Sequence, residues 1–105
     1  MIDWDRVAEL RDEIGVESFD EVVDLFLTEA DEVILRLHPD ADRKALESDC
    51  HFLKGAALNL GFKTLAAQCQ LREIQAARGQ DVDDLAVVYQ IYQESRQALL
   101  AGQAA

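Results

Sequence analysis

The segment from His51 to Gly55 holds the side chains of this chain that are best suited to chemistry. Imidazole is neutral over part of the physiological pH range, so it can act as a nucleophile. Lys54 follows His51 by three residues, where its charge can balance an anionic group on the histidine. Glycine inside a helix costs on the order of 1 kcal/mol relative to alanine. We therefore interpret Gly55, four residues after His51, as opening space for another molecule beside the ring.

These side chains share one face only if the segment is helical. Apolar residues recur at steps of four and three and predict a helix over residues 42–60. With about 100° per residue, His51 lies roughly 140° from the centre of the apolar seam, which places it toward solvent. An ordinary surface histidine would lie there too, so this geometry alone leaves both interpretations open. The predicted seam consists of Leu46, Cys50, Leu53, Ala57 and Leu60.

Two apolar residues flank the histidine on the same helix. Leu58 follows His51 by seven residues and shares its face, whereas Phe52 is adjacent in the sequence. Together they are a candidate docking patch for a partner. The alternative for Phe52 is that its ring packs under a neighbouring helix.

Turn residues and apolar spacing predict five helices in all. Four long helices with short connections and one apolar stripe each predict an all-α fold, an antiparallel four-helix bundle with an additional short N-terminal helix. Strand-like alternation of any length is absent from the sequence. The helices are expected over residues 3–14, from a capping box at Ser18–Glu21 to about residue 37, over 42–60 with Gly61 closing the helix, from about 62 to before Gly79, and from about 81 onward.

Length and composition narrow the class of protein. The 105 residues fit one domain over 1–105, and half of them are apolar, enough for a core. The net charge of −11 argues against nucleic acid as a ligand. No apolar run is long enough for a membrane span, and the acidic N-terminus does not resemble a secretory signal, so we expect a cytoplasmic protein.

Charge is distributed unevenly along the chain. Residues 43–78 carry a net charge of +3, whereas the remaining residues carry −14. The centre of the chain is therefore the region best suited to an anionic group or an acidic partner, although an uneven scatter of surface charge would give the same count. Cys50 and Cys69 match neither a disulfide framework nor a zinc motif, and we expect both to be small buried hydrophobes.

Two short motifs carry a resemblance to a known family. Residues 51–55, His-Phe-Leu-Lys-Gly, and residues 59–62, Asn-Leu-Gly-Phe, resemble the signature of histidine-containing phosphotransfer (HPt) domains. That signature is His-x-Leu-Lys-Gly, five variable residues and then Gly. The histidine, the lysine and both glycines match at the correct spacing on a predicted helix. The resemblance continues through residues 65–69 and, more loosely, across the whole chain in helix order and length.

The resemblance implies a role for each motif residue. His51 would be the phosphoacceptor and Lys54 the cation that stabilises the phosphoryl charge, while Gly55 would keep the surface open and Gly61 would do the same or close the helix. Phe52, Leu58 and Lys63 would join these two glycines in the partner-binding surface.

Family members often carry a polar residue on the next helix that binds the imidazole. Glu73 is the candidate here, because it falls on the inward seam of that helix. Its carboxylate could accept the Nδ1 proton and leave Nε2 as the nucleophile. A partly exposed glutamate that only supports its own helix is the alternative, and the sequence leaves both open.

A chain of this family would be a phosphoryl carrier of a two-component phosphorelay rather than an enzyme. It would accept a phosphoryl group from a receiver-domain aspartate and pass it to another receiver, using the partner's catalytic groups and metal and no cofactor or metal of its own. The expected partners are response-regulator receiver domains and a hybrid histidine kinase, and we expect a monomer because one chain completes the bundle. The alternatives are a four-helix adaptor without chemistry and the phosphoacceptor module of a chemotaxis-type kinase; the short chain favours a free-standing carrier.

Overall fold

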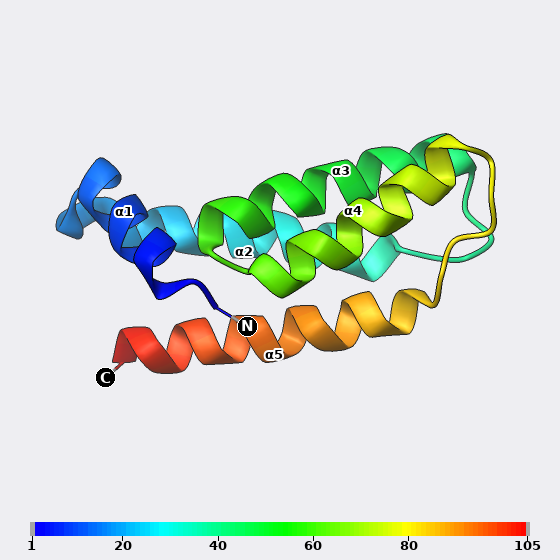
Figure 1. Ribbon diagram of the computed structural model, residues 1–105. Coiled ribbons are helices and arrows are strands. Elements are labelled where there is room, and N and C mark those ends of the chain that lie inside the picture. Colours follow the sequence, from blue (N-terminus) through cyan, green and yellow to red (C-terminus); the bar gives the residue numbers. More distant parts are fainter. Residues whose placement is uncertain (1, 105) are drawn as a thin grey trace.

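The computed structural model describes residues 2–104, with side chains placed up to residue 102. Five helices follow one another along these residues, and Figure 1 shows the four long ones running alternately in opposite directions while α1 crosses one end. The all-α fold predicted from the sequence is confirmed, and no strand occurs among the described residues, where Ile2 and Phe62 form one isolated bridge. The helices are α1 (Trp4–Ile14), α2 (Val16–Arg36), α3 (Arg43–Leu60), α4 (Lys63–Ala77) and α5 (Leu85–Ala104).

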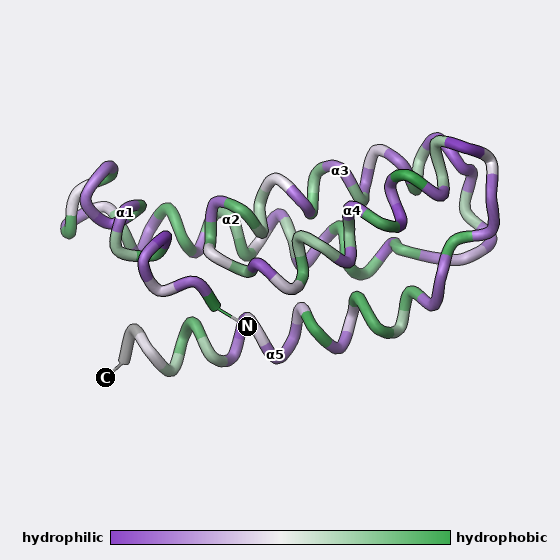
Figure 2. The backbone as a smooth tube through the Cα atoms, in the orientation of Figure 1, coloured by the Kyte–Doolittle hydropathy of each residue, from purple (hydrophilic) through white to green (hydrophobic). Residues whose placement is uncertain are grey.

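Each helix contributes one apolar face to a shared core. Figure 2 shows hydrophobic and hydrophilic residues alternating along every helix, as expected when one face is buried. All five residues of the predicted α3 seam are buried, so that prediction is confirmed. Among the helices of residues 2–104, none combines the length and apolar character that crossing a bilayer requires.

Helices α3 and α4 pack more closely than any other pair of helices. Their buried faces are rich in small side chains, which let two helix backbones approach each other. These side chains are Cys50, Ala57, Ala66, Cys69 and Ala76. The close approach matters for function because it brings polar residues at the edges of the two helices within reach of each other.

A two-residue connection sets the register of this pair. Gly61 ends α3 in a left-handed conformation with φ 77°, and Phe62 follows before α4 starts. His51 lies nine residues before the last residue of α3, and Glu73 lies ten residues after the first residue of α4. At 1.5 Å per residue, both are about 14 Å from the turn and therefore at the same level of the bundle.

Helix α5 is held against α2 by a polar cluster. The Asp31 carboxylate accepts hydrogen bonds from Tyr92 Oη and from Nε and Nη2 of Arg96, the last two at 3.1 Å. Burial, together with the neighbouring Asp31 carboxylate, raises the pKa of the Tyr92 phenol. These hydrogen bonds therefore join α5 to α2.

Two predicted helix starts were wrong. Helix α2 begins at Val16 with Gly15 before it, rather than after Ser18, because Gly15 (φ 96°) reverses the chain within one residue of α1. Helix α5 begins at Leu85 rather than near Asp81. The segment before it stays non-helical because Arg72 Nη2 donates to the carbonyl of Asp84 and Gln75 Oε1 accepts from the backbone of Asp83.

Replacing Gly61 tests how the α3–α4 turn is built. A Cβ at this position would lie 2.6 Å from the carbonyl oxygen of Asp3, whose own N–H donates to the carbonyl of Gly61 at 2.7 Å. We expect Gly61→Ala to lower the free energy of unfolding by roughly 2–4 kcal/mol, as measured by urea denaturation.

Gly79→Ala is the matched control, because Gly79 also has a positive φ but a Cβ there meets no atom within 4 Å. Its cost should be roughly 1 kcal/mol, the backbone contribution alone. Equal losses for the two variants would contradict a steric role for Gly61.

Candidate functional site

His51 lies on the solvent-facing side of α3, as the helical spacing predicted. Its side chain is 70% exposed, although Cys50 and Leu53 on the same helix are fully buried. The Nδ1 atom lies 2.9 Å from Oε2 of Glu73. Within the described part of the chain, Nε2 has no hydrogen-bond partner. The ring is therefore held at one nitrogen and open at the other.

Glu73 reaches His51 from α4. Its side chain is only 19% exposed, and its carboxylate lies between two groups, with Oε2 at His51 and Oε1 at 2.8 Å from Nζ of Lys54. The contact with Lys54 is an ion pair whose angles fall short of a well-aligned hydrogen bond. The pairing with Lys54 lowers the pKa of Glu73 and the contact with His51 adds to this, whereas desolvation opposes both. A deprotonated Glu73 accepts the Nδ1 proton, which in a neutral ring leaves a lone pair on Nε2.

Lys54 is oriented toward Glu73. Its side chain is 24% exposed, and Glu73 is its ion-pair partner among the described residues. Lys54 and His51 therefore contact the same carboxylate, an arrangement that helical spacing along α3 alone did not predict.

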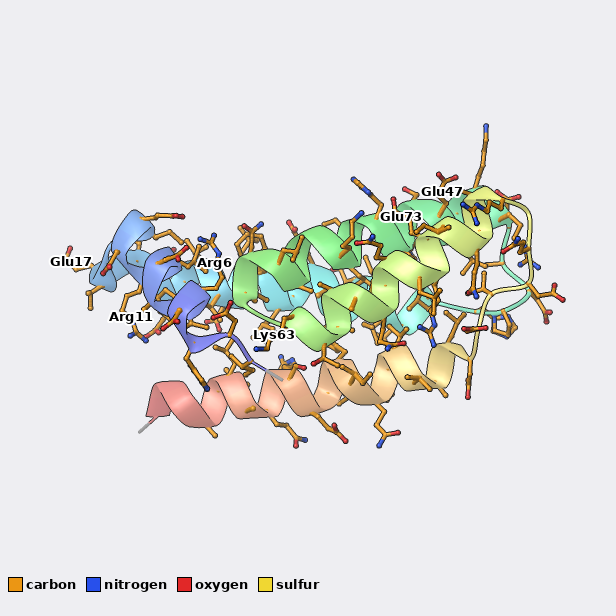
Figure 3. All side chains as sticks on the ribbon, in the orientation of Figure 1. Arg6, Arg11, Glu17, Glu47, Lys63 and Glu73 are labelled. Carbon is orange, nitrogen blue, oxygen red and sulfur yellow. The ribbon has the colours of Figure 1, made fainter. Side chains whose placement is uncertain are left out.

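A shallow hollow between α3 and α4 opens beside the imidazole. It is lined by Lys44, Glu47, Ser48, His51 and Glu73. Figure 3 shows Glu47 and Glu73 close together at the edge of the α3–α4 pair. The predicted site did not include Lys44, Glu47 and Ser48, although they precede His51 by seven, four and three residues and so share its side of the helix.

Three of the five predicted partner-binding residues lie around His51. Gly55 is exposed, and a Cβ there would meet no atom within 4 Å, so the surface beside the ring is open. Leu58 is also exposed, at 55%. Phe52 is half-buried and packs partly against the core, which corresponds to the alternative considered for it.

The other two predicted residues are placed away from the histidine. Gly61 is buried under Asp3 of the segment that precedes α1, so it closes α3 rather than lining an open surface. Lys63 is exposed at the first residue of α4, and Figure 3 shows it at the opposite end of that helix from Glu73.

Cross-helix contacts that the sequence did not indicate hold α3 in place. Arg36 of α2 donates to both carboxylate oxygens of Asp49, at 2.8 Å for the shortest contact. At the other end of α3, Arg6 of α1 donates to Asn59 Oδ1 at 3.4 Å. Both contacts join residues far apart in the sequence, so no local pattern could have found them.

The two cysteines lie in the core beneath the site. Cys50 and Cys69 are free and fully buried, as expected. Burial raises the pKa of Cys50 to about 11 and that of Cys69 to about 12, so neither thiol is a nucleophile near neutral pH. Among the residues that the structure describes, no group of three or more metal-ligating side chains is gathered in a way that could hold a metal ion.

Comparison with known proteins gives the family. The family model of the Hpt domain matches residues 21–102, which include α3, α4, most of α2 and nearly all of α5. Neither a curated protein nor a solved structure was found to match the chain. The chain belongs to the Hpt domain family. Its role is accordingly histidine phosphotransfer in two-component signalling, in which Hpt domains act as phosphocarriers rather than catalysts and interact with receiver domains and kinases.

The lowered pKa of Glu73 predicts a stability contribution that depends on pH. Folding favours its carboxylate form, so the contribution is present above the usual pKa of glutamate and is lost as the pH falls through the lower value in the folded chain. Glu73→Gln should therefore destabilise the protein at about pH 7 and have much less effect near pH 3.

Urea unfolding of the native chain and the variant at both pH values measures this. If Glu73→Gln lowers the free energy of unfolding by the same amount at both pH values, the charge of Glu73 is not what stabilises the fold.

Proposed function

We propose that the chain, as one domain, accepts a phosphoryl group from a receiver-domain aspartate on Nε2 of His51 and passes it to a second receiver. The observation that carries this proposal is an exposed imidazole whose Nδ1 is held by Glu73 while Nε2 is open to a partner. Family membership supports the reaction class, and the motif around His51 supports the residue.

The proposed transfer is an in-line displacement at phosphorus. The Nε2 lone pair forms the N–P bond while the bond from phosphorus to the aspartyl oxygen breaks, and the electron pair returns to the aspartate as its carboxylate. Nδ1 keeps its proton, which Glu73 accepts in a hydrogen bond. The receiver would supply its own catalytic groups and metal ion. Transfer to the next receiver is the reverse reaction at the same nitrogen.

Positioning and charge are the proposed contributions of the neighbouring residues. Glu73 orients the ring, and Lys54 balances negative charge at the site. Gly55 and Leu58, which are exposed on the His51 side of α3, and the exposed part of the adjacent Phe52 form the surface on which a receiver would dock. Lys63, at the first residue of α4, would meet only a partner whose contact surface extends from His51 to the α3–α4 turn.

The proposed partners are response-regulator receiver domains and, as a kinase, a hybrid histidine kinase. A net charge of −11 makes nucleic acid an unsuitable partner. We propose a monomeric carrier, and the two free, buried thiols support a reducing compartment such as the cytoplasm.

Replacing His51 tests the phosphoacceptor directly. A receiver domain carrying ³²P on its aspartate should label the native chain, and the label should be stable to base and labile to acid. His51→Gln should reduce labelling to background, while circular dichroism shows unchanged helix content because the side chain is exposed.

Labelling of His51→Gln equal to that of the native chain would move the phosphoacceptor to another residue. Binding of receivers without labelling of either protein would favour a four-helix adaptor instead.

Gly55→Ala should separate stability from transfer. A Cβ at this position meets no atom of the protein, so alanine should raise the free energy of unfolding by roughly 0.5–1 kcal/mol through its helix propensity. The methyl group would nevertheless stand one turn from His51 on the docking side. We expect the second-order rate constant of transfer to fall about tenfold or more.

Quench-flow kinetics measure the rate constant of transfer, and urea unfolding of the same preparation measures the stability. A more stable variant with an unchanged transfer rate would show that Gly55 does not serve partner approach.

A further inference from the structure

Glu73 connects two cationic or potentially cationic groups through different oxygens. Oε2 lies 2.9 Å from Nδ1 of His51, and Oε1 lies 2.8 Å from Nζ of Lys54. The imidazole and the ammonium group therefore do not compete for one oxygen. Since the described residues offer Lys54 no second carboxylate within ion-pair distance, its charge is directed at Glu73 rather than at the open side of the ring.

Phosphorylation changes the charge of the group that Glu73 contacts. When Nε2 forms its bond to phosphorus and Nδ1 keeps its proton, the neutral ring becomes a cation. The Nδ1–H···Oε2 hydrogen bond then joins a cation to an anion, and charge-assisted hydrogen bonds are about twice as strong as neutral ones. The carboxylate should therefore stabilise phosphorylated His51 more than the free histidine.

The negative charge of the phosphoryl group acts in the opposite direction. An uncompensated carboxylate at the Nδ1 side would repel it across the ring. Lys54 cancels most of that repulsion, because its ammonium group is in contact with the distant oxygen of the carboxylate. The Lys54 and Glu73 side chains are 24% and 19% exposed, so water screens this pair less than it screens an exposed pair.

We propose that Glu73 raises the equilibrium occupancy of phosphohistidine at His51, and that Lys54 contributes by neutralising Glu73 rather than by binding the phosphoryl group. The proposal rests on the proposed function and deepens it, because it assigns the affinity of the carrier for its phosphoryl group to one carboxylate. In this scheme Glu73 and Lys54 are positioning and charge-setting residues, and His51 alone forms a bond to phosphorus.

A double-mutant cycle tests the proposal. The ratio of phosphohistidine to phosphoaspartate is measured at equilibrium with a ³²P-labelled receiver domain that transfers to the native chain. The four proteins are the native chain, Glu73→Gln, Lys54→Met and the double variant. Glutamine keeps a neutral acceptor for Nδ1–H, so Glu73→Gln should lower the ratio about tenfold.

The second step of the cycle decides the role of Lys54. Lys54→Met alone should lower the ratio, because it leaves the carboxylate uncompensated, and Lys54→Arg should keep the native value. In the Glu73→Gln background the same methionine should have little effect. Glu47→Gln is the matched control, because Glu47 lines the same hollow but forms no ion pair or hydrogen bond with His51 or Lys54. Its ratio should change by less than about twofold.

A receiver-independent measurement follows the imidazole itself. In ¹⁵N-histidine NMR spectra, before and after phosphorylation with phosphoramidate, Nδ1 of native His51 should be protonated in both states. In the phosphorylated protein, its proton should be released at higher pH than in Glu73→Gln. A purely structural role of Glu73 would not move this titration.

Two results would overturn the inference. Equal losses on Lys54→Met in both backgrounds would show that Lys54 acts directly on the phosphoryl group. A ratio that rises in Glu73→Gln would show that repulsion by the carboxylate dominates. Absence of label on native His51 would instead overturn the proposed function itself, so the two failures are distinguishable.

Discussion

The close packing of α3 against α4 is the constraint on which the site depends. Small buried residues, Cys50 and Cys69 among them, let the two backbones approach, and the two-residue connection at Gly61 sets their register. Only with both conditions met does a side chain of α4 reach Nδ1 of a histidine that points toward solvent from α3. A larger side chain at the interface would move Glu73 away from the imidazole by separating the helices.

The site is nearly neutral on a strongly acidic protein. The chain has a net charge of −11, yet the carboxylate nearest to His51 is paired with Lys54. An anionic phosphoryl group would therefore meet a local field very different from that of the whole molecule, because nearby paired charges dominate over distant screened ones. The acidic exterior would instead affect the rate at which charged partners associate with the protein.

The two glycines of the family motif differ in their surroundings. Gly55 has space around it and costs helix stability, which is expected of a residue kept for contact with another molecule. Gly61 has a positive φ and lies against the backbone of Asp3, so it serves the fold.

Helix α1 also contacts α3, because Arg6 donates to Asn59, although α1 lies outside the matched residues 21–102. This contact lies at the C-terminal end of α3.

Features that depend on local periodicity and turn chemistry could be predicted from the amino-acid sequence alone. Apolar spacing predicted the buried seam of α3 and the outward direction of His51, because each follows from 3.6 residues per turn. Gly61 was predicted to end α3, because a left-handed residue after a helix favours glycine. The start of α2 was predicted wrongly, since a capping box at Ser18 competes with the reversal at Gly15 and local rules do not rank the two.

Contacts between residues of different helices depend on how the helices pack. Whether Glu73 contacts His51 or only supports its own helix depends on the rotation of α4 and on the distance between two helix axes, and neither is a property of one segment. The same holds for the pairing of Lys54 with Glu73 and for the burial of Gly61 under Asp3. Such contacts depend on how whole helix faces fit together, so no single segment of the sequence predicts them.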